Sequence, residues 1–277
     1  MLHEEIREEP LRPLLRWVGG KQYLLPQLLK HLPRRKFGTY LEPFLGAASM
    51  FLALRPRAAF LGDANPHLVS MYEYLRKNPL RVARHLSELA CQDSHSTYYR
   101  VRDQYNTSQP SFAQAARFLY LNRTCFNGIF RVNRNGQFNV PYGYKRNARF
   151  PTSMDLQTVA EAFSSARLVP CGYMSIVSAA IPGDFIYLDP PYPPLNGTSY
   201  FAHYTMDRFP DDEQNKLANA ARSLDARGCM VMISNADTPT IRRLYKGLII
   251  HKLSATRYVT CKSSKHRVGE VVITNYR

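Results

Sequence analysis

The 277-residue sequence has few cysteines, few acidic residues and no long hydrophobic run, and each shortage excludes a class of protein. Its five cysteines are scattered without C-x-x-C spacing, which argues against a disulfide framework and against a zinc site. No apolar stretch is long enough to cross a membrane, and the charged segment before Pro10 lacks the hydrophobic core of a signal peptide. We therefore expect a cytoplasmic protein with reduced thiols, no bound metal and no membrane partner.

Acidic residues are outnumbered by basic ones, 21 against 37, so the formal net charge is +16. Residues 66–150 hold 13 Lys/Arg and 4 Asp/Glu, which places +9 of this charge in the middle of the chain. A concentrated positive charge favours a polyanionic partner, because it attracts phosphate groups over a long range. On charge alone, a basic surface that is merely solvated is the alternative.

The most informative motif is Asp189-Pro190-Pro191-Tyr192, which directly follows the apolar run 185–188. A buried strand that ends in this way presents a carboxylate and a ring at the carboxyl edge of a sheet, where open α/β folds bind ligands. The exocyclic amine of a planar base is a poor nucleophile, because its lone pair is delocalised into the ring. Asp189 and the Pro190 carbonyl are suited to accept its two N–H hydrogens and free the lone pair, while Tyr192 stacks on the base. A proline-stiffened turn with a solvated aspartate is the alternative.

A strand–helix–strand unit is predicted near the start of the chain. The strand at 39–42 leads into the glycine-bearing turn 43–49, and the strand at 58–62 ends at Asp63. An acid in that position is suited to bind ribose hydroxyls. The turn lacks G-x-G-x-x-G and G-x-x-x-x-G-K-[ST], which disfavours a dinucleotide and excludes a P-loop. We expect a small cofactor that contains a ribose, with a purely structural turn as the alternative.

A basic helical insert follows, since apolar residues recur at helical spacing in 68–75, 80–89 and 112–121. After 150 the pattern returns to alternating strands and helices. The expected strands are 167–170, 185–188, 230–234, 249–253 and 270–274, and the expected helices lie near 210–224 and 238–245.

The insert ends in a predicted β-hairpin, because Asn135-Gly136 separates the strand-like runs 129–134 and 137–140. Arg131 lies on the first of these strands. A two-stranded ribbon fits the major groove of DNA, where an arginine can pair with guanine O6 and N7. A surface hairpin with solvated arginines is the alternative.

Six blocks of sequence occur together in one order, beginning near residue 12. They are Pro13-Leu14-Leu15-Arg16-Trp17-Val18-Gly19-Gly20-Lys21, Glu42-Pro43-Phe44-Leu45-Gly46, Asp63, Phe126-Asn127-Gly128-Ile129-Phe130-Arg131, Phe138-Asn139-Val140-Pro141-Tyr142-Gly143 and Asp189-Pro190-Pro191-Tyr192. As a set, they resemble the Dam-type DNA adenine-N6 methyltransferases, which methylate GATC as solitary housekeeping enzymes or as partners of a restriction endonuclease.

The resemblance implies an α/β fold, in which a Rossmann-like domain that uses S-adenosylmethionine (SAM) carries an inserted helical target-recognition domain with a β-hairpin. We assign residues 1–65 and 151–277 to the catalytic domain and 66–150 to the insert. The implied activity is methylation of adenine N6 in duplex DNA, within GATC, after the base is flipped out. The implied setting is the nucleoid of a bacterial or phage-infected cell, with no obligatory protein partner.

The resemblance also assigns roles to single residues. The positions expected to bind SAM are Trp17, Lys21, Glu42, Phe44, Gly46, Asp63 and Asp189, and the last also begins the catalytic motif with Pro190 and Tyr192. The positions expected to contact or wedge the duplex are Arg16, Phe126, Asn127, Ile129, Arg131 and Pro141, with Arg131 as the reader of guanine. For Trp17, Phe44, Phe126 and Ile129, an ordinary place in the core is the alternative.

Ala48 departs from the family pattern, which has a second glycine at this place in the first loop. If the backbone here needs a positive φ, alanine costs on the order of 1 kcal/mol and weakens cofactor binding. If the position lies in the first turn of a helix, alanine is favourable. Ala48 is the one hint of a competing function, a DNA-binding relative with weakened catalysis. A methyltransferase that acts on an RNA base is a second competing function, because it could use a similar pocket.

Overall fold

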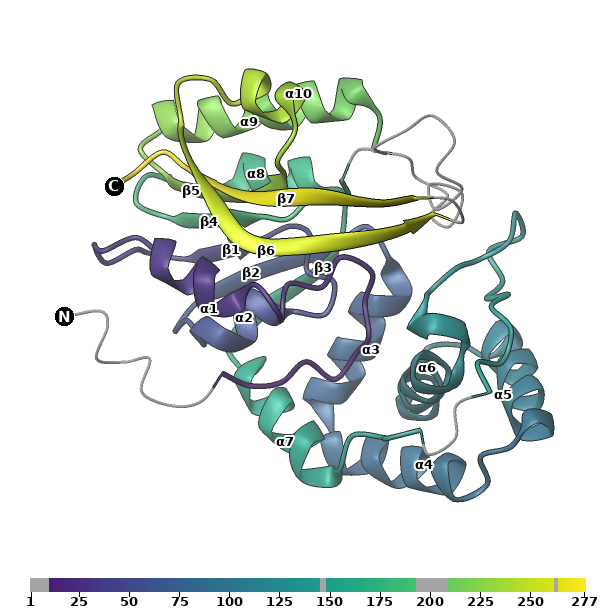
Figure 1. Cartoon of the computed structure of the whole chain (residues 1–277). Helices are drawn as coiled ribbons and strands as arrows, with labels where there is room; N and C mark the ends of the chain where they lie inside the picture. Colours follow the sequence, from purple (N-terminus) through teal and green to yellow (C-terminus); the bar gives the residue numbers. More distant parts are fainter. Residues whose placement is uncertain (1–9, 145–147, 193–208, 262–263) are drawn as a thin grey trace.

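A seven-stranded sheet forms the centre of the computed structural model, which describes residues 10–144, 148–192, 209–261 and 264–277 (Figure 1). The strand order is β3-β2-β1-β4-β5-β7-β6. The strands are β1 (Tyr40–Glu42), β2 (Ala59–Asp63), β3 (Ala166–Pro170), β4 (Phe185–Leu188), β5 (Met230–Ala236), β6 (Ile249–Cys261) and β7 (Ser264–Thr274). Neighbouring strands from β3 to β5 pair in parallel, and β7 runs antiparallel to both β5 and β6. The predicted Rossmann-like α/β class is confirmed.

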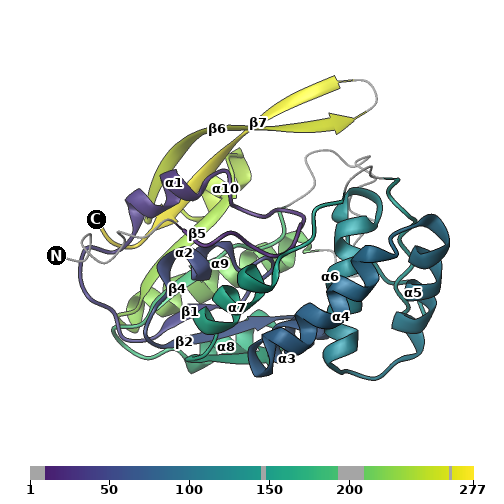
Figure 2. The ribbon, with the colours of Figure 1, turned by 90° about the horizontal axis from the view of Figure 1, so that it is seen from below.

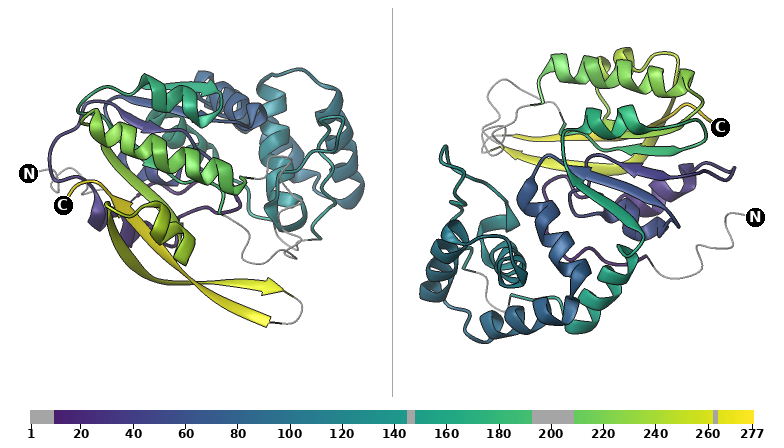
Figure 3. Two further views of the ribbon diagram at one scale, coloured as in Figure 1. Left: turned by 90° about the horizontal axis from the view of Figure 1, so that it is seen from above. Right: turned by 180° about the vertical axis from the view of Figure 1, so that it is seen from behind.

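Helices cover both faces of the sheet (Figure 3). The described helices are α1 (Leu25–Leu28), α2 (Ser49–Leu54), α3 (Pro66–Lys77), α4 (Pro79–Cys91), α5 (His95–Thr107), α6 (Phe112–Thr124), α7 (Ser153–Ala162), α8 (Tyr173–Ala179), α9 (Asp211–Ala226) and α10 (Pro239–Leu244). Alternate residues of the strands enter two separate hydrophobic clusters, one with α2, α3 and α7 and the other with α8, α9 and α10. This two-sided burial explains why β4 is apolar at every position.

The helices of the basic insert begin at residues that favour helix starts. Asn65 accepts hydrogen bonds from the backbone N–H groups of His67 and Leu68, with Pro66 in the first turn of α3. α3 packs on β2, β3 and α7 as well as on the insert helices α4 and α6, so it joins the sheet to the helical lobe. One hydrophobic cluster runs through both parts. The division at residues 65 and 151 therefore stays a prediction.

Regular strand pairing in the hairpin of the insert covers fewer residues than the sequence predicts. Its arms meet at a single bridge between Val132 and Phe138. The N–H of Asn133 donates to Gln137 O (2.8 Å), and the N–H of Gly136 donates to Asn133 O (3.0 Å). Gly136 has φ +75°, so the loop is a β-turn closed by a left-handed glycine.

The strands predicted after residue 150 are all present, but β6 and β7 continue well past the expected ends at residues 253 and 270. A register shift between Leu253 and Thr256 marks the place where this two-stranded ribbon leaves the sheet. The ribbon projects beyond the layered domain (Figure 2). Helices α7 and α8 were not predicted, because each is short, with 10 and 7 residues. Among the described helices, none is long and apolar enough to span a membrane.

Candidate active site

Three carboxylates lie where three neighbouring parallel strands end. β1 ends at Glu42, β2 at Asp63, and Asp189 comes directly after β4. β1 pairs with β2 on one side and with β4 on the other. The strand order therefore reverses its direction across the sheet at β1. Such a switch point forms a crevice at the carboxyl edge of an open sheet, which is the usual ligand site of the fold.

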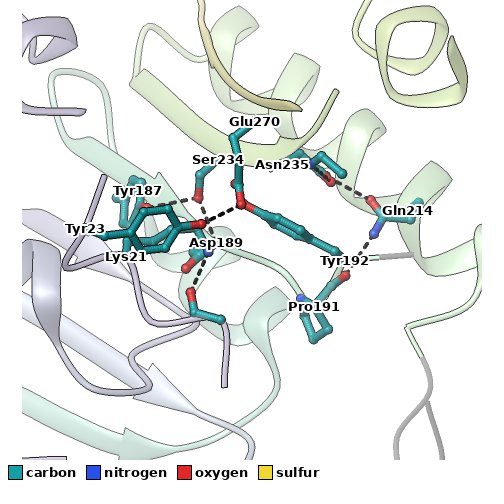
Figure 4. Close-up of polar contacts among 12 residues, drawn as sticks. Lys21, Tyr23, Tyr187, Asp189, Pro191, Tyr192, Gln214, Ser234, Asn235 and Glu270 are labelled. Carbon is teal, nitrogen blue, oxygen red and sulfur yellow. Dashed lines mark hydrogen bonds and ion pairs between the residues drawn. The ribbon is translucent and has the colours of Figure 1, made fainter. Parts of the chain in front are cut away.

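One oxygen of Asp189 is held by two donors (Figure 4). Lys21 Nζ lies 2.7 Å from Asp189 Oδ1, and the hydroxyl of Ser234 donates to the same oxygen at 2.7 Å. Because the proton of Ser234 is used there, the hydroxyl of Tyr187 donates to Ser234 Oγ, at 2.9 Å. In the part of the chain that the structure describes, no side chain or backbone group bonds to Oδ2.

Lys21 is an interior charge at the centre of the site. Its side chain is 5% exposed, and Nζ also donates to the Gly19 carbonyl at 2.6 Å. Nζ lies 4.6 Å from the ring centre of Tyr192, within the range of a cation–π contact. The ammonium therefore compensates the charge of Asp189 and contacts the aromatic face next to it.

The loop that carries Tyr192 is held from two sides. Gln214 on α9 donates to the Pro191 carbonyl at 3.1 Å, which leaves the Pro190 carbonyl without a bond to any described residue. The hydroxyl of Tyr192 donates to the buried carboxylate of Glu270. Burial raises the pKa of Tyr192 well above its ordinary value, and the charges of Asp189 and Glu270 act in the same direction. The phenol therefore stays a hydrogen-bond donor at any ordinary pH.

The turn after β1 is fixed by Asp63. The N–H of Gly46 donates to Asp63 Oδ2 and the N–H of Asn65 to Oδ1, both at 2.9 Å. Burial raises the pKa of Asp63, and these two backbone bonds partly oppose the rise. Gly46 has φ +48°, and an added Cβ would lie 2.9 Å from Cδ1 of Trp17. Glycine is therefore required here both by the backbone and by the indole ring.

Ala48 adopts the left-handed conformation, with φ 58° and ψ 29°, at the residue that precedes α2. The sequence allowed either a positive φ or the first turn of a helix at this position. The structure has the positive φ, which is the alternative that costs free energy. An alanine in this conformation is disfavoured by about 1–2 kcal/mol. The methyl group is fully buried in the hydrophobic cluster below the turn, which offsets part of this cost.

The two aromatic residues predicted to line the cofactor site pack against different hydrophobic clusters of the fold. Trp17 stacks on Phe118 and Phe130 of the helical lobe, with ring centres 6.4 and 6.2 Å apart. Phe44 stacks on Tyr173 at 5.3 Å on the other side of the sheet. Both rings are partly buried, so each packs against the core and still presents an edge outside it.

Glu42 lies fully buried at the end of β1. Its Oε2 accepts hydrogen bonds from the Tyr40 hydroxyl (2.7 Å) and from the N–H of Phe51 (3.2 Å). Burial raises the pKa of Glu42 to about 8; the nearby charge of Asp189 also raises it, whereas the two hydrogen bonds lower it. At neutral pH this carboxyl group therefore carries a proton.

This raised pKa predicts a pH-dependent stability. Between the ordinary value of 4.5 and about 8, folded Glu42 keeps a proton that the unfolded chain has lost, so the free energy of unfolding falls as pH rises. We expect Glu42→Gln, which is neutral at every pH, to remove several kcal/mol of this decline. Urea unfolding at pH 5, 6.5 and 8 measures it for both proteins. A stability difference between them that stays constant with pH would contradict the prediction.

The residues expected to contact DNA lie together on the helical lobe. Arg131 Nε donates to Asn139 Oδ1 at 2.7 Å, and Nη2 donates to the Asn139 carbonyl at 3.3 Å, so the guanidinium is held across the hairpin. Asn122 bonds to the backbone of Arg16 in both directions, at 2.9 and 2.8 Å. An added Cβ on Gly128 would lie 2.7 Å from Cβ of Arg16, so the first block packs directly on the hairpin segment.

The other expected DNA contacts differ in exposure. Phe126 is 49% exposed, Pro141 is exposed, and Asn127 is exposed with φ 54°. The Pro141 carbonyl accepts the N–H of Phe126 at 2.9 Å, which holds the segments of these residues together. Ile129 is only 7% exposed and packs inside the lobe. Of the two apolar candidates, Phe126 is the one with surface to offer to a duplex.

Four residues of the site were not predicted from the sequence, namely Tyr187, Gln214, Ser234 and Glu270. Ser234 and Glu270 had a usable signal, since each is a polar residue that directly adjoins an apolar run, 230–233 for Ser234 and 271–273 for Glu270. Both are buried, which is unusual for a polar side chain unless it has a partner. Tyr187 and Gln214 had none, because a tyrosine in a strand and a glutamine in a helix are ordinary.

Comparison with known proteins gives a consistent result over nearly the whole chain. A family model described as D12 class N6 adenine-specific DNA methyltransferase matches residues 17–259. The Type II methyltransferase M1.LlaDCHI of Lactococcus lactis subsp. cremoris is 35% identical, over 96% of each chain. M.MjaIII of Methanocaldococcus jannaschii, also a Type II methyltransferase, is 35% identical over 96% of this chain and 99% of its own. The DNA adenine methylase of Escherichia coli K12 is 32% identical over 96% of this chain and 95% of its own.

Proposed function

The chain belongs to the D12 class of N6 adenine-specific DNA methyltransferases, and from this premise we propose that it methylates adenine in duplex DNA within GATC, with SAM as the methyl donor. It acts in the cytoplasm, where the DNA is its partner. The catalytic domain is residues 1–65 and 151–277, and residues 66–150 recognise the target.

The observation that carries the proposal is the arrangement of Asp189. Its Oδ1 is held by Lys21 and Ser234, so Oδ2 is presented to the amino group of a flipped adenine. Oδ2 accepts one N6 hydrogen and the Pro190 carbonyl accepts the other, which frees the nitrogen lone pair. A sulfonium donor bound beside this group would supply the methyl, and Asp189 Oδ2 would be the first acceptor for the proton that N6 gives up.

The residues of the donor site fit a SAM molecule. The donor supplies an electrophilic methyl group on a sulfonium. Asp63, at the end of β2, is placed as an acceptor for ribose hydroxyls. We assign the charged methionine end to the turn at Gly46, close to the buried carboxyl group of Glu42 and the ammonium of Lys21. Trp17 and Phe44 exclude water from either side of the crevice. Holding both reactants in line contributes on the order of 7–11 kcal/mol to the rate.

The helical lobe holds the duplex. Arg131, fixed by Asn139, pairs with a guanine of the site. Phe126 enters the stack where the adenine leaves it, and Ile129 supports it from within the lobe. Arg16, Asn127 and Pro141 contact the backbone and the neighbouring bases from the same surface.

The proposal is tested by incubating the protein with SAM and an unmethylated plasmid. We expect N6-methyladenine in the digested nucleosides, and protection of the plasmid from an endonuclease that N6 methylation blocks at GATC. A plasmid in which every GATC is altered, a structured RNA and a reaction without SAM are the controls. Methylation of RNA alone would favour the competing activity on RNA, and binding of DNA with no methylation would identify a DNA-binding relative without catalysis.

A further inference from the structure

Glu270 joins two loops of the active site that are far apart in the sequence. Its carboxylate is buried in the sheet, with 1% exposure. The hydroxyl of Tyr23 donates to Oε1 at 2.8 Å, and the hydroxyl of Tyr192 donates to Oε2 (Figure 4). Tyr23 follows closely after Lys21, and Tyr192 ends the catalytic motif. One carboxylate therefore connects the segment of the first block with the loop of the catalytic motif.

The two phenols provide the hydrogen bonds that this carboxylate needs. Within residues 10–144, 148–192, 209–261 and 264–277, no lysine, arginine or histidine forms an ion pair with Glu270. A buried carboxylate without partners is strongly disfavoured, whereas hydrogen bonds to an ionised acceptor are about twice as strong as neutral ones. Each bond therefore restrains its tyrosine more than an ordinary hydroxyl contact would.

The backbone of Glu270 is itself firmly placed. It forms the last rung between β7 and β5, opposite Ala236, at the point where the ribbon leaves the sheet. The neighbouring Gly269 lies so close to β5 that an added Cβ would be 3.2 Å from Cβ of Asp237. The carboxylate thus projects toward the pocket from a rigid part of the fold.

We propose that Glu270 is a positioning residue that holds the hydroxyl end of Tyr192, so that the ring stays where the target adenine stacks on it. The hydroxyl at the far end of the ring is bound to Glu270, and the Lys21 ammonium lies over its face at 4.6 Å. Because the phenol oxygen lies on the long axis of the ring, the bond to Glu270 fixes the direction of this axis, and the contact with Lys21 opposes rotation about it. The inference rests on the proposed function, because it assumes that Tyr192 receives the base.

The test is a double-mutant cycle of Glu270→Gln and Tyr192→Phe. Each single variant loses the charged hydrogen bond, and Tyr192→Phe keeps the ring. We expect kcat/KM for DNA to fall about tenfold in each single variant and no further in the double variant. The reason is that both substitutions remove the same hydrogen bond, between Glu270 and Tyr192. The Kd for SAM should stay within twofold of wild type. With 2-aminopurine in place of the target adenine, fluorescence of the bound duplex should be higher in both variants, since looser stacking quenches it less.

Asp93→Asn is the matched control. Asp93 accepts a hydrogen bond from the hydroxyl of Tyr120 at 2.7 Å in the helical lobe. The substitution therefore changes a tyrosine–carboxylate bond of the same kind outside the site. Its kcat/KM and fluorescence should equal those of wild type. Effects that multiply in the double variant, or a Glu270→Gln protein within twofold of wild type, would overturn the inference. If Glu270→Gln does not fold, Tyr192→Phe alone decides: unchanged fluorescence and turnover overturn it. A wild-type protein that methylates no DNA would instead refute the proposed function.

Discussion

Asp189→Ala is expected to reduce methyl transfer by at least about a thousandfold and to leave DNA binding nearly unchanged. The substitution removes the acceptor that frees the N6 lone pair, and no other described carboxylate can replace it, since Glu42 is turned toward Tyr40 and Phe51 and Asp63 bonds to the turn. The DNA contacts proposed for the helical lobe do not involve Asp189. Single-turnover methylation with excess enzyme measures the chemical step, and fluorescence anisotropy with labelled duplex measures binding.

Removing this carboxylate also leaves Lys21 as a buried charge without its partner, which can destabilise the fold by about 3–5 kcal/mol. Asp189→Asn is therefore measured beside it, because the amide keeps the shape of the side chain and can still accept the hydroxyl of Ser234. Thermal melting of both variants separates loss of folding from loss of chemistry. A folded Asp189→Asn protein with a methylation rate within tenfold of wild type would refute the assigned role.

Arg131→Ala is expected to reduce discrimination against sites with an altered guanine by about fivefold to 150-fold, which corresponds to about 1–3 kcal/mol. The guanidinium is fixed by two bonds to Asn139, so the free protein already holds it in one orientation. The variant should lose rate on GATC while its rate on altered sites changes little. The ratio of kcat/KM for duplexes that differ at one guanine measures this, with 7-deazaguanine as the smallest change.

Arg134→Ala is the matched control, since this arginine is exposed on the turn of the same hairpin. A phosphate contact should weaken binding uniformly across sequences and lower the salt dependence of log Kd by about one unit of slope. The ratio between cognate and altered duplexes should then be unchanged. If Arg131→Ala also keeps the wild-type ratio, the reader of guanine lies elsewhere.

Some features of this protein followed from the sequence because the signals are local. A run of four apolar residues before Asp189 is enough to predict a strand buried on both faces, and the structure has β4 at those residues. Asp63 was expected at the end of a strand, and it ends β2. The six blocks pointed to the family, and the family match confirms it.

Other features depended on contacts that local patterns do not record. Glu270 lies 78 positions after Tyr192 and 247 after Tyr23, so no window of sequence contains the three together. The exposure of Phe126 and the burial of Ile129 likewise depend on how the hairpin packs on the lobe. The conformation of Ala48 remained open, because its sequence suits a helix start as well as a strained turn.

The sequence by itself determined the family and the fold class, and it singled out Asp189 as the candidate for the reacting carboxylate, because these depend on residues that are neighbours along the chain. Only the tertiary structure decided which oxygen of Asp189 is held by Lys21 and Ser234, and that Glu270 binds Tyr192. The physical reason is that the hydrogen-bond partners of a buried polar group come from whichever strands the sheet brings together, and here they come from β4, β5, β7 and the first block of the chain.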